Sequence, residues 1–397
     1  MHKFLQTLLT GVCFALAFVL PARGEITLPP DVMEAATEGI NGVYSLDFAT
    51  AQKNIEKVFS MYPDHPFAHF GNAMIAWARY EYEFETSDEK QRKVFEKILD
   101  DSISGTKRWL KQNPRDPNAY MGLGALNGLR ALFNMRNRNW VTSYFSGRKA
   151  IYNLEQSLKI DPTYYDAYFG LGVYEYFAGT LPRVIKVLAK IVAIKGNPDT
   201  GVKYLNKARE QARFTQDSAK LILIQVQNTR GSKFYAPAKS LEYIRGLHQK
   251  FPNNPLMRYV EIICLYEMGD LGSVSSQARE FLSLIGTNPY YKSIYIPRAY
   301  TALGTAEMAR GNFKEARAIF EEGAQKIKTQ DPSRWGVWNA LRLGQAYDVL
   351  GEREKAQQQY RYVLSFKDKW GFDELAKSLL KTPYKVPAEG VGPLPPL

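Results

Sequence analysis

Cysteine and histidine are scarce in this chain of 397 residues, which holds two cysteines and four histidines. Cys13 lies in an apolar N-terminal stretch that we expect to be removed, which leaves Cys264 as the remaining thiol. A single thiol cannot form an internal disulfide, so the folded chain must be held together by packing. The apolar residues next to Cys264 disfavour its thiolate, and we therefore expect no reactive cysteine.

Motifs for catalysis or metal binding are also missing. His65 and His69 have the spacing of two metal ligands on one helix, but Pro66 places His65 before the helix begins. The glycine pairs at 122/124 and 170/172 follow no predicted strand and lack the third glycine of a nucleotide-binding loop. No serine or cysteine nucleophile stands in a motif, and the adjacent carboxylates at 100/101 and 321/322 diverge around a helix axis. We therefore predict a protein that is not an enzyme and that binds neither a metal nor a cofactor.

A long apolar run occurs only near the N-terminus, where Phe4 to Leu20 follows a positively charged start and precedes "PARGE". Ala22 and Gly24 have the spacing that a signal peptidase requires, so we predict a cleavable signal peptide over residues 1–24. A run of 17 residues is at the lower limit for a membrane span, which makes an uncleaved anchor the weaker alternative. We therefore expect an exported, periplasmic protein, with peripheral membrane association as a further expectation.

Acidic residues are outnumbered, since 52 lysines and arginines face 40 aspartates and glutamates for a net charge of +12. This balance favours acidic partners, namely anionic lipid, a cell-wall polymer or an acidic protein. The cations are dispersed, and the stretch that mixes them with aromatics, Arg130 to Trp140, is predicted as a loop between helices. Because we also expect export, nucleic acid is not an expected partner.

Alternating β-branched residues with hairpin turns are missing, which argues against an extensive sheet. Apolar residues have helical spacing instead, as at Leu241, Ile244 and Leu247. Proline steps interrupt this pattern, and proline disfavours helical backbone in the residue before it. We predict that each step separates two helices. The steps lie at 62–63, 113–114, 161–162, 197–198, 251–252, 288–289 and 331–332.

Three segments of the first half nearly superimpose: "HPFAHFGNA" from His65, "DPNAYMGLG" from Asp116 and "YYDAYFGLG" from Tyr164. In each, an alanine is followed by a histidine or a tyrosine, then by an apolar residue and a glycine. A second small residue stands two positions after the glycine. Two later copies begin at Ala299 and Asn339 and keep a constant offset of 40 residues. Their matching pairs are Leu303 and Leu343, Gly304 and Gly344, Gly311 and Gly351, Ala316 and Ala356, and Phe320 and Tyr360.

This pattern resembles the tetratricopeptide-repeat (TPR) superfamily, in which a Leu-Gly pair on a first helix precedes a turn glycine, then alanine and an aromatic residue on a second helix. The resemblance implies an all-α, right-handed solenoid over residues 25–380, with about six or seven helical hairpins. The period is longer and less regular than the usual 34 residues or so. The central "FAGTLPRVIKVL" also resembles an exported bacterial branch, with weaker similarity to TPR proteins of the eukaryotic mitochondrial surface.

In TPR proteins the first helix of each hairpin lines the concave face. The residues on that side of each first helix are therefore the predicted residues of a partner-binding groove. In the N-terminal half the selected side chains are apolar or aromatic, so we expect a groove that binds a partner or ligand or is covered. In the C-terminal half they are mixed and polar, without the lysine and asparagine pattern that binds a peptide carboxylate in some members. The predicted groove residues are Phe67, Phe70, Met74, Trp77, Met121, Phe169, Val173, Tyr176, Arg298, Trp338 and Asp348.

The segment "LPRVIKVLAKIVAIKG", from Leu181 to Gly196, interrupts the repeat within an irregular insertion near residues 178–200. It is strongly apolar, and Arg183, Lys186 and Lys190 fall within one narrow arc of a helix. Three interpretations stay open: a core helix, an interfacial helix whose cations contact anionic lipid, and a gate over the aromatic groove. The three cations are the candidate residues for a membrane surface.

The C-terminal end is different in composition. "WGFDELAKSLL" from Trp370 predicts a capping helix with Asp373, Glu374 and Lys377 on its outer side. Residues 381–397 are rich in proline and glycine, and we expect an extended tail with a frayed end rather than a docking motif.

Together these features predict a non-enzymatic scaffold of the bacterial cell envelope that presents a concave groove to a protein partner. The alternative is a periplasmic carrier that holds a lipid or another hydrophobic ligand in the aromatic N-terminal groove.

Overall fold

The computed structural model describes residues 28–83, 89–137, 139–180, 195–327, 333–366 and 372–394. Within these ranges every regular element is a helix, which confirms the all-α prediction. The predictions for residues 1–24 and for Arg183, Lys186 and Lys190 lie outside the described residues.

Helices that are consecutive along the chain lie next to each other and run in opposite directions. Their bounds are α1 (Pro30–Tyr44), α2 (Phe48–Met61), α3 (Pro66–Glu83), α4 (Glu89–Gln112), α5 (Pro117–Arg136), α6 (Trp140–Ile160), α7 (Ala167–Gly179), α9 (Pro198–Gln211), α10 (Gln216–Gln227), α11 (Pro237–Lys250), α12 (Pro255–Glu267), α13 (Leu271–Leu284), α14 (Ile296–Ala309), α15 (Phe313–Lys326), α16 (Arg334–Val349), α17 (Arg353–Leu364) and α18 (Asp373–Lys381), with a 3₁₀ turn η1 (Ser293–Tyr295) before α14.

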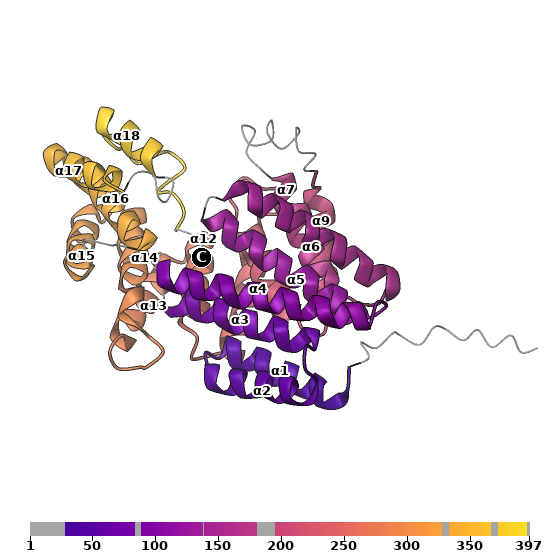
Figure 1. Cartoon of the computed structure of the whole chain (residues 1–397). Coiled ribbons are helices and arrows are strands. Elements are labelled where there is room, and N and C mark those ends of the chain that lie inside the picture. Colours follow the sequence, from indigo (N-terminus) through magenta and orange to yellow (C-terminus); the bar gives the residue numbers. More distant parts are fainter. Residues whose placement is uncertain are drawn as a thin grey trace, which may run out of the picture.

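Consecutive helices pack as TPR-like hairpins, as Figure 1 shows for α3 with α4 and for α5 with α6. In the described residues there are eight such pairs, from α1–α2 to α16–α17, followed by α18. The expectation of six or seven hairpins is therefore too low. The first pair precedes the first copy of the sequence repeat at His65, and so the repeat pattern did not reveal it.

The proline steps end and begin helices as predicted. Helices α2, α4, α6 and α11 stop directly before steps 62–63, 113–114, 161–162 and 251–252. Aspartate or asparagine before a proline also caps the next helix, because its side chain accepts a backbone N–H that the first turn leaves unpaired. Asp116 accepts from Asn118 N at 2.8 Å, and Asn197 accepts from Asp199 N at 2.9 Å.

The small residues of the repeat mark close helix contacts. A Cβ atom built on Gly304 would lie 2.4 Å from the Phe320 ring, and one on Gly344 would lie 2.6 Å from the Tyr360 ring. These are the two glycine–aromatic pairs that the 40-residue offset relates, so the repeat reflects how a first helix packs on its second. The turn glycines Gly311 and Gly351 have φ of +81° and +80°, a conformation that glycine adopts without steric cost after a helix end.

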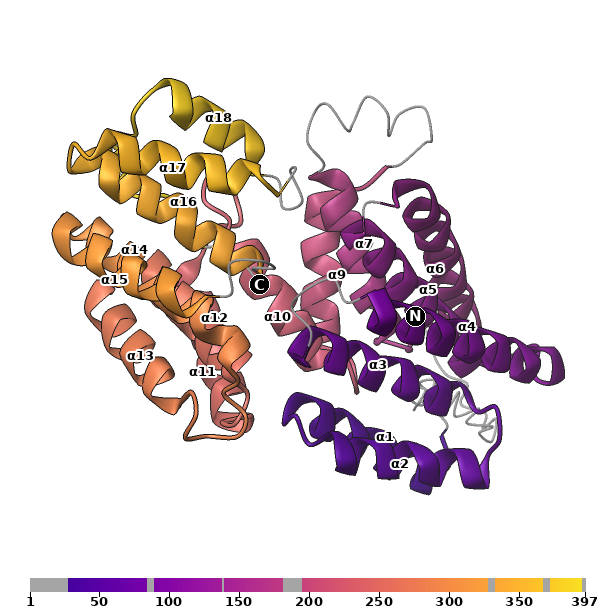
Figure 2. The same ribbon diagram turned by 60° about the vertical axis from the view of Figure 1, so that its left-hand side comes forward.

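The curved chain brings its first hairpin against the junction of α11 and α12. The hydroxyls of Tyr44 and Ser218 are hydrogen-bonded at 2.7 Å, and the Tyr44 ring stacks on Phe251 with centroids 5.0 Å apart. Asn254 caps α12 and also donates from Nδ2 to the Tyr44 carbonyl at 2.8 Å. We call α1–α10 the N-terminal body and α11–α18 the C-terminal arm. Figure 2 shows α10 between the two.

Helix α18 covers the end of the arm. Ala376 and Leu379 are buried, whereas Glu374 and Lys377 are exposed and hydrogen-bonded to each other. This is the capping arrangement that the sequence predicts.

Candidate functional site

The C-terminal tail lies against the C-terminal arm instead of fraying into solvent. After α18 the chain continues without helix to residue 394, the last described residue, and Figure 2 places this end between the arm and the body, beside α10 and α12. Val391 and Leu394 are buried, at 4% and 2% exposure. For the described part of the tail, up to residue 394, the expectation of fraying is therefore wrong, because Val391 and Leu394 pack on a hydrophobic surface that the tail sequence alone does not reveal.

Three side chains of the arm and its neighbouring loop bind the tail through its main chain. The Tyr266 hydroxyl lies 3.2 Å from the Val391 carbonyl and 3.1 Å from the Gly392 carbonyl. Arg342 Nη2 donates to the carbonyls of Gly392 and Pro393 at 2.9 and 3.0 Å. Arg230 Nη1 approaches the Val391 carbonyl at 3.5 Å. We call Arg230, Tyr266 and Arg342, with the apolar residues that receive Val391 and Leu394, the tail groove.

The apolar part of the tail groove comes from the first helices of consecutive hairpins. Val391 belongs to the hydrophobic cluster that contains Met308 of α14 and Leu341 of α16. Leu394 belongs to the neighbouring cluster, which contains Tyr259 and Ile262 of α12. A chain segment without helix therefore inserts two apolar side chains, three residues apart, while its carbonyls face cationic and hydroxyl donors.

Burial makes these donors effective. Arg342 is only 4% exposed, and its Nη1 donates to Gln345 Oε1 at 3.0 Å. Burial lowers the pKa of this guanidinium from its ordinary value, but arginine stays charged at any physiological pH. Burial also raises the pKa of Tyr266, so at neutral pH its hydroxyl keeps the proton that it donates. Hydrogen bonds from a charged donor in such surroundings are stronger than those between neutral groups.

Asp348, a predicted groove residue, anchors the beginning of the tail. Its carboxylate is fully buried and forms an ion pair with Arg353 at 2.8 Å. It also accepts from the Tyr360 hydroxyl at 2.7 Å and from Tyr384 N at 2.8 Å. Arg353 in turn donates to the carbonyls at the end of α18. Asp348 therefore joins α16, α17 and the tail, and its side chain is not free to contact a partner.

Arg298 and Trp338, the other predicted groove residues of the arm, both pack against aromatic rings. The Arg298 guanidinium lies 4.8 Å from the Trp335 ring centroid and 5.1 Å from that of Tyr295. Trp338 packs edge-on against Phe372, with centroids 5.0 Å apart. The sequence analysis did not select Arg342, although it follows Trp338 by four residues and therefore lies on nearly the same face of α16.

The predicted N-terminal groove residues fall into separate hydrophobic clusters between helices. Phe67 packs on Phe214 at 5.1 Å, and Trp77 packs on Phe95 at 5.4 Å. Contacts within and between hairpins bury these side chains in part, and all of them except Tyr176 keep an intermediate exposure. Their role in partner binding stays a prediction. The remaining members are half-buried or buried in the same manner: Phe70, Met74, Met121, Phe169, Val173 and Tyr176.

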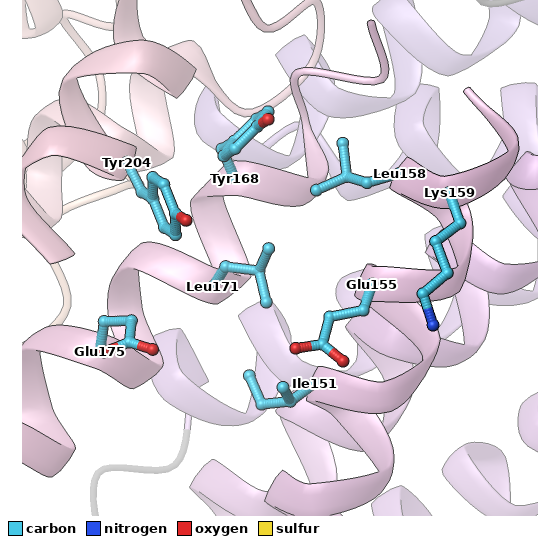
Figure 3. Close-up of a pocket in the computed structure, with 8 residues that line it drawn as sticks. All are labelled: Ile151, Glu155, Leu158, Lys159, Tyr168, Leu171, Glu175 and Tyr204. Carbon is cyan, nitrogen blue, oxygen red and sulfur yellow. The ribbon is translucent and has the colours of Figure 1, made fainter. Parts of the chain in front are cut away.

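A depression between α6, α7 and α9 is shown in Figure 3 and has a volume of about 470 Å³. Leu158, Leu171 and Tyr204 line it together with two carboxylates, Glu155 and Glu175. The Glu175 carboxylate accepts from Asn197 N at 2.7 Å. Because charged groups share the lining, this depression does not have the apolar character that a carrier of hydrophobic ligands requires.

The histidines have structural contacts. His65 Nδ1 accepts from Phe67 N at 3.2 Å, so this side chain caps α3, and burial lowers the pKa of His65 to about 4. His69 Nε2 lies 3.1 Å from Asp64 Oδ1, and Arg108 binds the same carboxylate through two hydrogen bonds. Among the described residues no group of three or more His, Cys, Asp or Glu side chains could hold a metal ion.

Two further predictions concern Cys264 and the stretch from Arg130 to Trp140. Burial raises the pKa of the Cys264 thiol to about 12, in keeping with an unreactive cysteine. The stretch is not a loop, because α5 continues to Arg136 and α6 begins at Trp140. Arg130 lies on α5 and pairs with Asp100 of α4. No helix in the described ranges is long and apolar enough to span a membrane.

Neither a family model nor a curated protein matches this sequence. Solved structures that match include NprR in complex with its cognate peptide NprX, with 10% identity, 89% of this chain and 84% of that chain covered, and a TM-score of 0.45. Yeast Tom70 has 12% identity, 89% and 90% coverage and a TM-score of 0.41. A tetratricopeptide repeat protein from Parabacteroides merdae has 12% identity, 75% and 94% coverage and a TM-score of 0.31. Because these TM-scores lie below 0.5, the TPR-like fold rests on the helix pairs of this chain itself.

Proposed function

We propose that this protein is a non-enzymatic interaction module whose C-terminal arm binds an extended segment of a partner protein. In the isolated chain its own tail occupies the site. The observation that carries the proposal is the main-chain hydrogen bonding of Tyr266 and Arg342 to residues 391–393. Donors that bind carbonyl oxygens recognise an extended backbone whatever its side chains, and therefore suit a peptide ligand.

The tail also indicates the chemistry of the ligand. Two apolar side chains three residues apart, Val391 and Leu394, enter the clusters of the arm, and Gly392 and Pro393 stand between them. A Cβ atom on Gly392 would lie 3.5 Å from Arg342 Nη2, an ordinary van der Waals contact, so this position does not require glycine. The expected ligand is a segment of the form apolar–x–x–apolar in a conformation without helix.

The test uses a chain that ends at Glu389, which removes the segment in the groove but keeps the bond between Asp348 and Tyr384. A fluorescent peptide with the sequence of residues 389–397 is titrated against this chain and against the full-length chain. We expect the shortened chain to bind the peptide at least tenfold more tightly, because in the full-length chain the tail competes at high effective concentration.

Two controls address the geometry. Arg342→Met in the shortened chain keeps the apolar stem but removes both hydrogen bonds, and should weaken binding about tenfold or more. A peptide with serine in place of Val391 and Leu394 should not bind. Equal affinity of both chains for the peptide, or unchanged affinity of the Arg342→Met variant, would contradict the proposal. Circular dichroism spectra identical to that of the full-length chain establish that the variants are folded.

We further propose that this module works in the periplasm, as the predicted signal peptide indicates, and that its partners are envelope proteins, acidic ones among them. N-terminal sequencing of the protein isolated from a periplasmic fraction should begin at Glu25. The carrier alternative predicts co-purifying lipid in native mass spectra, and a mass equal to that of the polypeptide alone counts against it.

A further inference from the structure

Helix α6 has a second apolar face that the fold does not use. Its buried side chains, Ser146, Ala150, Leu154 and Ser157, face the neighbouring helices. Val141, Phe145, Arg148 and Tyr152 lie within an arc of about 60° on nearly the opposite side, as follows from about 100° per residue. Figure 2 shows α6 at the outer edge of the N-terminal body. This outer face is therefore not required for packing between hairpins.

The apolar side chains of this face are well exposed. Val141 is 68% exposed, and Trp140, Phe145 and Tyr152 are 58–59% exposed. Leu132 and Met135, in the last two turns of α5 before the connection to α6, are also exposed. Single exposed apolar residues are ordinary on a protein surface, but Val141, Phe145 and Tyr152 gather on one face of a single helix.

Cations predominate on the first part of this face, and its acidic residue, the exposed Glu155, lies one turn beyond Tyr152. Residues 131–154 contain no aspartate or glutamate, whereas Arg148 and Lys149 lie exposed on α6 beside the apolar side chains. Neither cation has an ion pair within the described residues. By contrast, the exposed face of α17 carries Glu354 and Lys355 side by side. Such a mixture of both charges is expected of a helix face that contacts only water.

We propose that the outer face of α6, with the adjoining end of α5, is a docking surface for an anionic lipid bilayer. We name Leu132, Met135, Trp140, Val141, Phe145, Arg148, Lys149 and Tyr152 the α6 membrane face. A helix that carries aromatic and aliphatic side chains with flanking cations has the composition of a helix lying in the membrane interface, and the first four turns of α6, Trp140 to Leu154, contain no acidic residue. Its apolar side chains enter the boundary of the acyl chains, and the two cations contact lipid phosphates.

Charge distinguishes a bilayer from the other partners that an apolar patch could take. A second copy of the α6 membrane face would bring Arg148 and Lys149 of one chain against those of the other, which disfavours a dimer through this face. A single-stranded nucleic acid would stack on Trp140 and Phe145 but would leave Val141, Leu132 and Met135 exposed to water. The face does not overlap the tail groove, so failure of the peptide experiment leaves this proposal unaffected.

The first test measures flotation with vesicles. It uses the chain that begins at Glu25, which retains every described helix, and vesicles of phosphatidylethanolamine with phosphatidylglycerol. We expect the triple variant Trp140→Ser, Val141→Ser, Phe145→Ser to lose at least tenfold in vesicle affinity. The matched control, Val94→Ser, Met268→Ser, Leu375→Ser, changes three residues of comparable exposure elsewhere and should stay within twofold.

The second test concerns charge. The variant Arg148→Glu, Lys149→Glu should bind anionic vesicles at least tenfold more weakly, and raised salt should weaken binding of the unchanged chain. The control Lys53→Glu, Lys107→Glu makes the same charge change at exposed positions of α2 and α4 and should have a small effect. Vesicles of phosphatidylcholine alone should bind the unchanged chain much more weakly.

A third measurement places the face in the lipid directly. An environment-sensitive dye attached to Val141→Cys should shift its emission to the blue when anionic vesicles are added. The same dye attached to Val94→Cys should not shift. The native Cys264 is buried and does not react with the dye. The proposal is overturned if the triple variant floats as well as the unchanged chain, or if the chain does not float at all. A dye response to an acidic protein or an oligonucleotide, without one to vesicles, also overturns it.

Discussion

The N-terminal body and the C-terminal arm use their inner faces in different ways. In the body, aromatic side chains such as Phe67 and Trp77 are taken up by packing, and Tyr44 joins the first hairpin to the α11–α12 junction. In the arm, Tyr266 and Arg342 bind a segment that has no helix of its own. Both regions consist of the same hairpins. Thus the residues on the inner face, and not the hairpin itself, decide whether a repeat region packs only on its own helices or also binds a non-helical segment.

The largest expected effect tests how tightly the body is packed. A Cβ atom on Gly201 of α9 would lie 2.5 Å from the backbone nitrogen of Tyr176 in α7, and backbone cannot move aside as a flexible side chain can. We expect Gly201→Ala to lower the free energy of unfolding by about 3 kcal/mol, measured by urea denaturation.

The matched control lies in the arm. No atom lies within 4 Å of a Cβ on Gly246, in the middle of α11, so Gly246→Ala should stabilise the chain by up to about 1 kcal/mol. A loss of stability with Gly246→Ala, or none with Gly201→Ala, would mean that the contact between α7 and α9 is not as close as described.

A smaller change in the free energy of unfolding is expected when the pH is lowered, and it arises from His65 in the N-terminal body. The pKa of His65 is lowered to about 4 by burial, whereas it is about 6.5 in an unfolded chain, so the unfolded state binds the proton more readily between these values. Stability is therefore fully present above pH 6.5 and decreases as the pH falls towards 4. The expected loss between pH 6.5 and pH 5 is about 2 kcal/mol.

His65→Asn keeps a side chain that can cap α3 but removes the titrating group. Urea denaturation at pH 7 and pH 5 should show a smaller pH dependence for this variant than for the unchanged chain. The same pH dependence in both would show that the carboxylates, and not His65, control acid sensitivity.

The smallest expected effects distinguish a hydrogen bond that stabilises the whole fold from hydrogen bonds that only hold the tail on the arm. Tyr44→Phe removes the hydrogen bond to Ser218 and should lower the free energy of unfolding of the whole chain by about 1 kcal/mol. Tyr266→Phe removes the hydrogen bonds to Val391 and Gly392, and should mainly accelerate amide hydrogen exchange in the tail. If amide hydrogen exchange in the tail is unchanged in the Tyr266→Phe variant, the conclusion that Tyr266 holds the tail on the arm is wrong.

The sequence by itself determined the helical class, the hairpin pairs of the repeat and most helix ends. These features are local: proline steps, capping residues such as Asn254, and the pairs Gly304 with Phe320 and Gly344 with Tyr360 act within one or two helices. A pattern of residues close along the chain is sufficient to specify them, and for this reason the later repeats could be aligned without a structure.

The tertiary structure alone decided which surfaces remain open. The contact between Tyr44 and Ser218 joins residues 174 positions apart, and Arg342 binds carbonyls 50 and 51 positions away. No periodicity along the sequence encodes such distances, because they depend on the accumulated curvature of several hairpins. For the same reason the sequence did not predict that the tail docks on the arm.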